Sequence, residues 1–332
     1  MLSSFIEVDD QETASKDDEP TDEGIPRTSS EPEHSEVSKH STRSITRSLV
    51  EEHFENGRRY CSEDYYMPND EPEQTRLAIA HQAYMPALDD QLTWGLIPRS
   101  AKRILDIGTG TGDWATAIAE RFPNAEIIAT DITNAFQPPS APLNVYFELD
   151  DAQNEWAYNE PFDFIHMRNL SGAFANWGAI YAEVSKNLKP GGSFEIADPG
   201  PIQYKRETSN SNTSIFNGAI RSAADMSGRP LDLDHLKKPM FDNAGLSVAK
   251  TRVFEIPLGT YDPDPRKKLT GKMAMIAVLE GLEAVSLRLL TKHLGWKEED
   301  VRGLCRKVQE EVMRPDARAF IRVQFVIARK LM

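Results

Sequence analysis

The sequence has few cysteines, no long apolar run and no excess of positive charge. No stretch of its 332 residues reaches the roughly 18 consecutive apolar residues of a membrane helix, and its acidic start lacks the basic and apolar regions of a signal peptide. Only Cys61 and Cys305 are present, and their spacing matches neither a metal site nor a redox pair. We therefore expect a protein of a reducing compartment, the cytoplasm or the nucleus, with no membrane span and no bound metal.

The formal net charge of −14 argues against electrostatic binding to nucleic acid. Most of this charge lies at the start of the chain, where residues 1–40 hold twelve acidic and three basic residues. Residues 1–48 are also rich in Ser and Pro and nearly free of aromatic side chains, so they bury too little apolar surface to offset the entropy lost on ordering. We predict a disordered acidic tail over 1–48, a folded domain over 49–332 and no direct binding of nucleic acid.

Strand-like and helix-like segments alternate through the middle of the chain, which is typical of parallel crossover units in an α/β sheet with helices on both faces. After residue 199 the pattern is mainly helical. The last apolar run lies near the end of the chain, and we expect it to complete the sheet as an antiparallel strand. The expected strands are 103–107, 126–131, 144–149, 162–167, 193–197, 246–256 and 319–328, and the expected helices are 73–92, 112–121, 176–188, 214–227, 233–244, 265–292 and 297–311.

A glycine-rich stretch, RILDIGTGTGDWATAIAERF at 103–122, leads from an expected strand into an expected helix. Gly108, Gly110 and Gly112 give the pattern G-x-G-x-G. The dinucleotide-binding fingerprint instead needs a glycine where this chain has Asp113. A P-loop is excluded as well, because no Gly-Lys-Ser/Thr follows at the right spacing. The loop is therefore expected to hold a nucleotide-like ligand of another kind.

Carboxylates surround this loop in the sequence pattern. A pyrophosphate favours a helix N-terminus free of carboxylates, and no Lys or Arg stands nearby to neutralise one. The pattern therefore favours a cationic, phosphate-free adenosyl ligand over NAD. Taken alone, two of these acids, Asp113 and Asp150, are more typical of a helix cap and a solvated turn. The full set is Asp106, Asp113, Asp131, Asp150 and Asp151.

The residues from Asp106 to Gly112 resemble the first motif of class I S-adenosylmethionine-dependent methyltransferases. The resemblance implies a Rossmann-like α/β fold of seven strands that binds S-adenosyl-L-methionine. It divides the domain into a helical lead-in (49–100), a cofactor-binding core (101–200) and a helical acceptor side with the final strands (201–332). It also implies that the loop backbone lies under the amino-acid part of the cofactor, that Asp131 binds the ribose hydroxyls and that Asp151 reads the adenine. The cofactor-binding residues implied are Asp106, Gly108, Thr109, Gly110, Gly112, Asp131, Ile132, Asp151 and Ala152.

From about Tyr60 to the C-terminus, the chain is similar to the fungal LaeA-like methyltransferases, in the stretches YYMPNDEPEQTRLAIAHQAY, FDFIHMRNLSGAFANW, LKPGGSFEI, EGLEAVSLRLLTKHLGW and VIARK. Asp113 departs from the pattern, because many relatives have a bulky apolar residue there. The family contains regulators of secondary metabolism and development, some bound to velvet-type proteins, and tailoring enzymes of biosynthetic clusters. The resemblance implies methyl transfer to a small-molecule or protein acceptor. The alternative is a regulatory subunit that binds the cofactor and acts mainly through protein partners.

The end of the fourth expected strand, HMRNLSG, should face the cofactor, because ligands of open α/β sheets bind at the carboxyl ends of strands. His166 is a weak candidate for a general base, and Arg168 is a candidate for binding the cofactor or an acidic group. Both residue types at a strand end are more often structural. The polar segment 198–214 is expected to act as a lid, with helices 214–227 and 265–292 supplying the apolar wall of an acceptor pocket.

Overall fold

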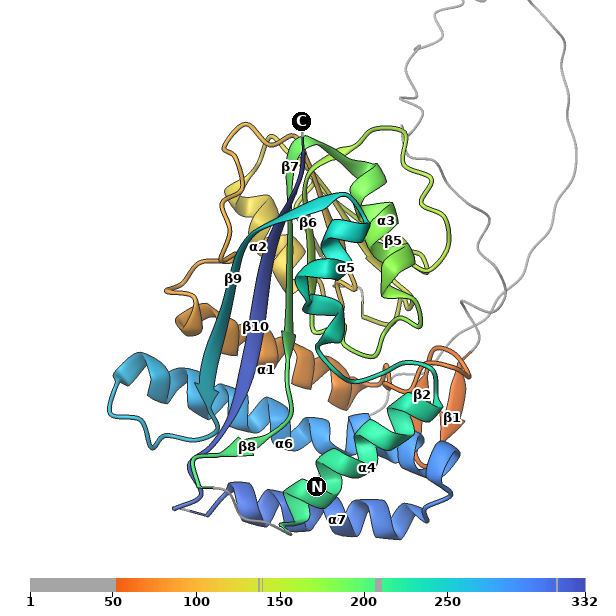
Figure 1. Ribbon diagram of the computed structural model, residues 1–332, viewed down its shortest axis with the longest axis vertical. Helices are drawn as coiled ribbons and strands as arrows, with labels where there is room; N and C mark the ends of the chain where they lie inside the picture. Colours follow the sequence, from red (N-terminus) through yellow and green to blue (C-terminus); the bar gives the residue numbers. More distant parts are fainter. Residues whose placement is uncertain (1–51, 137, 139, 207–210, 315, 332) are drawn as a thin grey trace, which may run out of the picture. The chain divides into compact units, whose positions relative to one another are not determined.

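The central sheet places the predicted strands side by side (Figure 1). The computed structural model describes residues 52–331, apart from 137, 139, 207–210 and 315, so the predicted tail at 1–48 lies outside the described residues. The strand order is β5-β4-β3-β6-β7-β10-β8, and β9 also pairs with β10. The strands are β3 (Arg103–Ile107), β4 (Glu126–Asp131), β5 (Val145–Leu149), β6 (Phe162–Arg168), β7 (Leu188–Pro199), β8 (Gln203–Tyr204), β9 (Leu246–Pro257) and β10 (Ala319–Lys330).

Strands β3 to β7 pair in parallel, whereas β10 runs antiparallel to β7, β8 and β9. The predicted mostly parallel sheet with an antiparallel C-terminal strand is therefore confirmed. The short strand β8 is an eighth member that the sequence pattern does not predict. The inner strands β3, β4 and β6 are buried along most of their length, which explains why they are nearly continuous apolar runs.

Helices cover both faces of the sheet. On one face, α2 (Asp113–Arg121) packs against β3, β4 and β5 in one buried apolar cluster. On the other face, α3 (Trp177–Asn187), the 3-10 helix η2 (Asp234–Leu236) and α5 (Lys238–Asn243) pack against β3, β6, β7 and β10. The expected helix at 233–244 is thus two short helices, with Lys237 in an extended conformation between them.

A third layer closes the end of the sheet at which β7 finishes (Figure 1). It consists of α1 (Glu71–Ala87), α4 (Asn212–Met226), α6 (Pro265–Leu294) and α7 (Glu298–Val312), which share one apolar cluster with β9 and β10. Local capping fixes where these helices start. Asp70 accepts from the backbone N–H of Glu73, and Asp264 accepts from those of Arg266 and Lys267.

Three local features differ from the sequence-based expectation. Helix α1 includes Pro86 but ends at Ala87, five residues before its predicted end. Strand β7 begins five residues before its expected start at 193, and the stretch KPGG at 189–192 forms an irregularity within it, where Phe162 pairs with Leu188 but Phe164 pairs with Ser193. The N-terminal hairpin of β1 (His53–Glu55) and β2 (Arg58–Tyr60) was not expected from the sequence. It turns through residues 56 and 57, both with positive φ.

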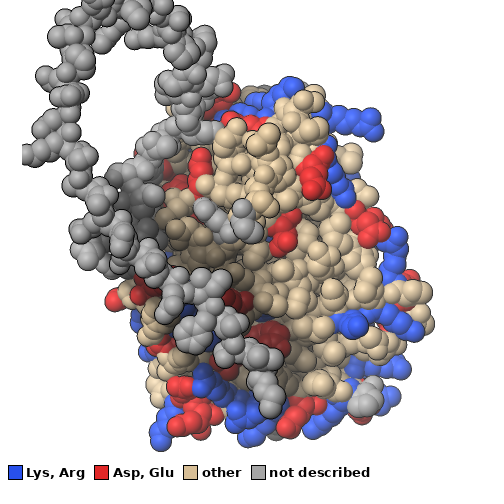
Figure 2. All heavy atoms as spheres, turned by 180° about the vertical axis from the view of Figure 1, so that it is seen from behind, with Lys and Arg blue, Asp and Glu red and all other residues tan. Residues whose placement is uncertain are grey.

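The surface carries both signs of charge close together. Figure 2 shows basic side chains along the border of one face, mixed with acidic ones and surrounding a large uncharged area.

None of the helices among the described residues is long and apolar enough to cross a membrane.

Candidate functional site

A cavity of about 970 Å³ lies at the carboxyl ends of β3, β4 and β6, and helices α1, α4 and α6 also line it. This is the edge at which open α/β sheets bind ligands, and the volume suits a small molecule. Of the ten predicted cofactor-binding residues, Gly112 does not line the cavity. The other nine do: Asp106, Gly108, Thr109, Gly110, Asp131, Ile132, Asp151, Ala152 and Arg168.

The glycine loop depends on backbone geometry that favours glycine. Gly110 has φ of +56°, and a Cβ at this position would lie 3.3 Å from Leu77 Cδ1 of α1, in the space between the loop and the helix. Gly112 has φ of +75° and precedes α2, and a Cβ there would lie 2.6 Å from Phe147 Cε1 of β5. Gly112 is therefore required by packing between α2 and β5, whereas Gly110 borders the cavity.

Asp131, at the end of β4, is held by backbone donors. Its Oδ2 accepts from Gly110 at 2.8 Å, and its Oδ1 accepts from Thr133 at 3.2 Å. Burial, with a smaller contribution from the charge of Asp106, raises the pKa of Asp131 to about 6 against the effect of these hydrogen bonds. Ionised Asp131 is therefore short of stabilising partners at neutral pH, and hydroxyl donors or positive charge on a ligand would supply them.

Three more acids of the set expected around the glycine loop also line the cavity, including two that the sequence pattern assigned to a cap and a turn. These two are Asp113 and Asp150, and the third is Asp151. Asp151 Oδ1 accepts from the backbone N–H of Gln153 at 3.0 Å, so it also closes a turn. The side chains that border the loop therefore make this end of the cavity acidic, and the adenine-reading role of Asp151 stays a prediction.

His166 is enclosed by its neighbours. Its Nδ1 lies 2.7 Å from Asp106 Oδ1, and its ring stacks on Trp114 with a centroid distance of 3.8 Å. Asp106 also accepts from Thr109 Oγ1 at 2.7 Å. Burial lowers the pKa of His166 although Asp106 opposes this effect, so the neutral form is favoured. This arrangement links β6 to the glycine loop and is that of a positioning residue; the role as a general base stays a prediction.

Arg168 is a partly buried cation on the wall of the cavity. Its Nη2 donates to His81 Nδ1 at 2.9 Å, and its guanidinium carbon lies 4.4 Å from the centroid of the Tyr84 ring. Burial and the adjacent Arg168 lower the pKa of His81 to about 4, so His81 is neutral and can accept this bond. Burial also lowers the pKa of Arg168, and in the described part of the chain it forms no ion pair. A carboxylate on a ligand would balance this charge.

The opposite half of the cavity is apolar. Two predicted helices, 214–227 and 265–292, supply much of this wall as α4 and α6, as expected. Of the predicted lid at 198–214, residues 199–202 line the cavity, residues 203–204 form β8, and residues 207–210 lie outside the described chain, so the lid stays a prediction. The apolar lining includes Phe216, Ile220, Ile256, Ala274, Ala277, Val278, Leu282, Val285, Ile321 and Val323.

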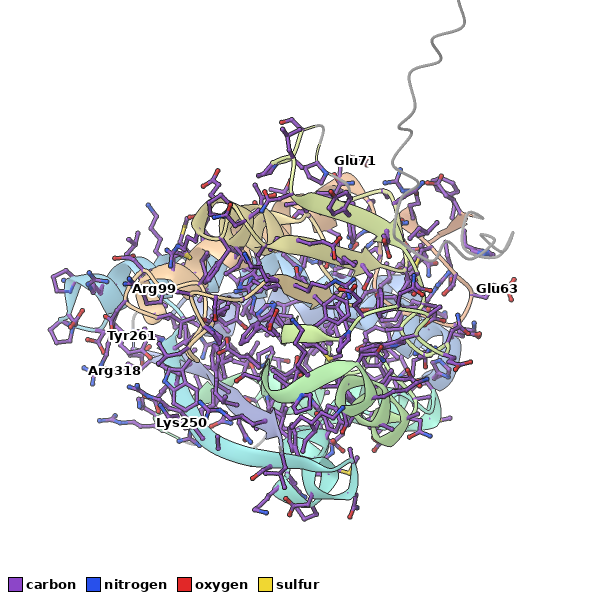
Figure 3. All side chains as sticks on the ribbon, turned by 90° about the horizontal axis from the view of Figure 1, so that it is seen from above. Glu63, Glu71, Arg99, Lys250, Tyr261 and Arg318 are labelled. Atoms are coloured by element: carbon purple, nitrogen blue, oxygen red, sulfur yellow. The ribbon has the colours of Figure 1, made fainter. Side chains whose placement is uncertain are left out.

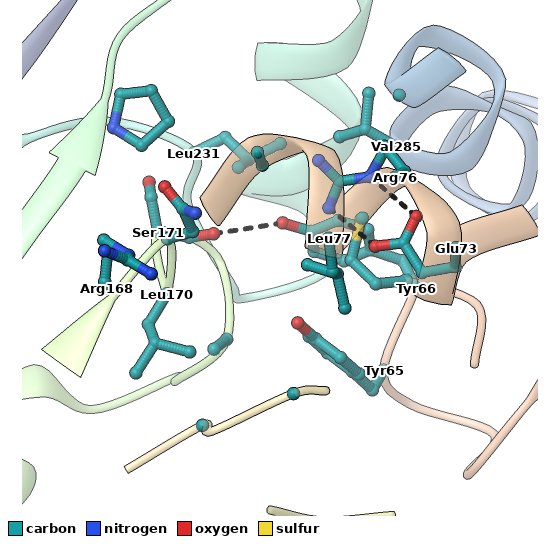
Figure 4. Close-up of a pocket in the computed structure, with 18 of the residues that line it drawn as sticks. Tyr65, Tyr66, Glu73, Arg76, Leu77, Arg168, Leu170, Ser171, Leu231 and Val285 are labelled. Carbon is teal, nitrogen blue, oxygen red and sulfur yellow. Dashed lines mark hydrogen bonds and ion pairs between the residues drawn. The ribbon is translucent and has the colours of Figure 1, made fainter. Parts of the chain in front are cut away.

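Residues 61–68, here called the strap, also line the cavity, except for Glu63, and the sequence analysis did not predict them. Arg288 of α6 donates to the backbone oxygens of Ser62 at 2.6 Å and Tyr65 at 2.8 Å, and Lys292 donates to that of Glu63 at 2.7 Å. The Glu63 side chain points away from the body of the domain (Figure 3), whereas the Tyr65 hydroxyl points into the pocket (Figure 4). The adjacent tyrosines just before an expected helix were the available signal.

Comparison with known proteins shows the family of this chain. The model of a methyltransferase domain matches residues 78–250. The chain is 33% identical over 293 residues to methyltransferase pytC of Aspergillus terreus, covering 86% of this chain and 90% of that protein. It is 30% identical to the secondary metabolism regulator LAE1 of Cochliobolus heterostrophus, over 84% of this chain and 94% of that one. The chain belongs to the LaeA-like methyltransferases. A solved structure of coclaurine N-methyltransferase with N-methylheliamine and SAH has a TM-score of 0.45 and 16% identity, covering 77% of this chain and 72% of that one.

The cofactor of this methyltransferase is S-adenosyl-L-methionine, and the cavity fits its chemistry. The absence of a side chain at Gly110 lets a ligand approach the backbone closely. The raised pKa of Asp131 shows that its carboxylate would be stabilised by hydroxyl donors of a ligand. The positive charge of Arg168 can bind a carboxylate. The acidic surroundings of the loop suit a ligand with positive charge. When bound, the cofactor supplies a methyl group on a positively charged sulfur. Gly110, Asp131 and Arg168 would hold it.

Proposed function

We propose that this methyltransferase acts on a small, largely apolar molecule. One observation carries the proposal: the apolar side chains of α4, α6, β9 and β10 share a single cavity with the glycine loop and Asp131. A molecule bound against this wall would be close to the cofactor and separated from bulk water. Positioning of this kind supplies much of the acceleration of a methyl transfer. The similarity to the secondary metabolism regulator LAE1 supports a link to secondary metabolism.

Labelling with methyl-labelled cofactor tests this proposal. The pure protein is incubated alone, with the organic-soluble fraction of a fungal extract, and with the protein fraction of the same extract. We expect label in a small molecule of the organic fraction, and much less label with the variant Asp131→Ala at the same cofactor concentration. Label confined to the protein fraction, or to the methyltransferase itself, would contradict a small-molecule acceptor.

We propose a regulatory role as the second candidate, because regulator LAE1 is similar to this chain over nearly its whole length. In that role the protein would act in the nucleus or cytoplasm through protein partners of the velvet type, with cofactor turnover secondary. Affinity purification from a fungal host tests it. A partner retained equally by the wild type and by Asp131→Ala supports this role, and the absence of a stoichiometric partner opposes it.

A further inference from the structure

An ion pair lies in the wall of the apolar half of the cavity, formed by Glu73 and Arg76 of α1. Arg76 Nε and Nη2 donate to the two carboxylate oxygens of Glu73 at 2.7 and 2.6 Å. The side chains are only 3% exposed for Glu73 and 16% for Arg76. Burial opposes the charge on Arg76, but Glu73 outweighs it and raises the pKa of Arg76, so the pair is ionised without net charge.

This pair leaves hydrogen-bond donors of Arg76 unused. A guanidinium has five N–H donors in a fixed plane, and the bidentate contact with Glu73 occupies two of them. Among the residues that the structure describes, none accepts a hydrogen bond from Arg76 Nη1. Figure 4 shows the pair in the pocket wall, close to Tyr66 and Val285. Hydrogen-bond donors in an apolar pocket gain a partner only when a ligand brings an acceptor atom.

Helix α6 has a glycine at the point where Arg76 approaches it. Gly281 lies inside α6, and a Cβ at this position would lie 3.3 Å from Arg76 Cδ and 3.9 Å from its Nη1. Glycine destabilises a helix interior relative to alanine. Its presence at this position is explained by the close approach of Arg76. Val278, Leu282 and Val285 of the same helix line the cavity. Arg76 therefore lies where α6 forms the acceptor wall.

Arg76 is also separate from the residues that would hold the cofactor. On α1, Leu77 faces the glycine loop, and His81, one turn further, contacts Arg168. Residues four apart share a helix face, so this row of α1 borders the cofactor end. Arg76 instead lies against Gly281 of α6. Arg76 and Arg168 are thus assigned to different ligands.

We propose that Arg76 anchors the methyl acceptor by donating a hydrogen bond to a neutral oxygen, such as that of a ketone, ester or ether. The inference rests on the proposed function, because it gives the chemical class of the small molecule. A neutral oxygen fits better than a carboxylate, because Glu73 already cancels the charge of Arg76 and a second anion would be buried without compensation. The proton stays on Arg76 throughout, so the residue positions the acceptor and takes no part in the transfer.

Three naphthalene probes test the assignment on protein saturated with S-adenosylhomocysteine. They are 2-acetylnaphthalene, its isostere 2-isopropenylnaphthalene with a methylene in place of the oxygen, and 2-naphthoate. By calorimetry we expect the wild type to bind the ketone about tenfold more tightly than the other two, as a hydrogen bond from a charged donor allows. In Glu73→Leu/Arg76→Leu, which removes both charges together, this preference should vanish while the affinity for S-adenosylhomocysteine stays unchanged.

Arg76→Lys keeps the charge beside Glu73 but loses the planar fork, so its preference for the ketone should fall between the two proteins. This variant keeps the test decisive if the double variant does not fold. Equal binding of ketone and isostere by the wild type, or tighter binding of 2-naphthoate, would overturn the role proposed for Arg76. Either result would leave the proposed small-molecule pocket standing. A loss of cofactor affinity in either variant would assign Arg76 to the cofactor instead. If no probe binds the wild type at all, the small-molecule pocket of the proposed function fails with it.

Discussion

The backbone N–H of Gly110 donates to the Asp131 carboxylate at 2.8 Å, so the glycine loop and the end of β4 are joined within the protein itself. The same carboxylate has a pKa raised to about 6 by burial. The Asp131 side chain therefore fixes the loop, and its negative charge is only partly stabilised at neutral pH. A ligand that donates hydroxyl groups or brings positive charge would gain affinity from this imbalance, which makes Asp131 the most informative position in the site.

Asp131→Asn should weaken cofactor binding by about 1–3 kcal/mol, because it removes a charged hydrogen-bond acceptor. Calorimetry with S-adenosylhomocysteine measures the loss. Asp113→Asn serves as the matched control, since Asp113 lines the same cavity but opens α2. A larger loss in the control than in Asp131→Asn would remove Asp131 from its predicted role.

The same variant should also change how the stability of the cofactor-free fold depends on pH. The pKa of Asp131 rises from 3.8 to about 6 on folding, so between these values the folded state binds more protons and loses stability as pH increases. The ionised carboxylate thus costs stability at neutral pH. We expect the melting temperature of the cofactor-free wild type to fall as the pH rises from 5 to 7, and that of Asp131→Asn to fall less, because asparagine does not titrate. An equal pH dependence in the two proteins would contradict the raised pKa.

Gly110→Val should abolish measurable cofactor binding, because a branched side chain would occupy the space between the loop and Leu77 and strain a residue with φ of +56°. Gly228→Val is the matched control. Gly228 has φ of +73°, but a Cβ there would meet nothing within 4 Å. Both variants should lose stability from backbone strain, and only Gly110→Val should lose affinity. Equal affinities would place the loop outside the cofactor site.

His166→Gln should act on stability more than on chemistry. The substitution removes the stacking on Trp114 and weakens the link to Asp106, and buried changes of this kind typically cost about 1–3 kcal/mol. We expect a lower melting temperature and a pH profile of kcat/KM with an unchanged shape. A general base would instead show a fall in kcat of about 100-fold or more and the loss of one limb of the profile.

The sequence was sufficient for elements that have a clear pattern of apolar residues. Strands β3 and β4 match their expected bounds, since buried parallel strands are uninterrupted apolar runs. Long-range geometry was not readable in this way. Tyr65 is held over the cavity by Arg288, 223 positions away, and the strap that contains Tyr65 has no periodic pattern. Gly112 fits the cofactor motif by position, yet its contact is with Phe147, which only the folded chain reveals.

Deletion of residues 1–48 should leave the domain intact. Their composition predicts too little apolar burial to support the fold, so the melting temperature should change by no more than a few degrees and the affinity for S-adenosylhomocysteine should not change. Scanning calorimetry and titration of the shortened and full chains measure both quantities. A large fall in either one would show that the acidic segment packs on the domain.

Arg288→Met should loosen the strap and weaken cofactor binding. Arg288 is buried on α6, stacks on Tyr60 and donates to the backbone of Ser62 and Tyr65, while Glu55 pairs with its Nε at 2.8 Å. Removal of these donors leaves two strap carbonyls without their partners, so we expect faster hydrogen exchange over 61–68 and about tenfold weaker binding of S-adenosylhomocysteine.

Arg302→Met is the matched control for this change. Arg302 donates to the backbone of Asn56 in the hairpin at 3.0 Å, next to the strap but outside the cavity lining. It should therefore alter exchange around the hairpin without changing cofactor affinity. If Arg288→Met and Arg302→Met bind S-adenosylhomocysteine equally well, the strap is a structural cover with no part in holding the cofactor. If only Arg288→Met loses affinity, α6 controls both ends of the cavity, because the same helix forms the acceptor wall through Val278 and Val285.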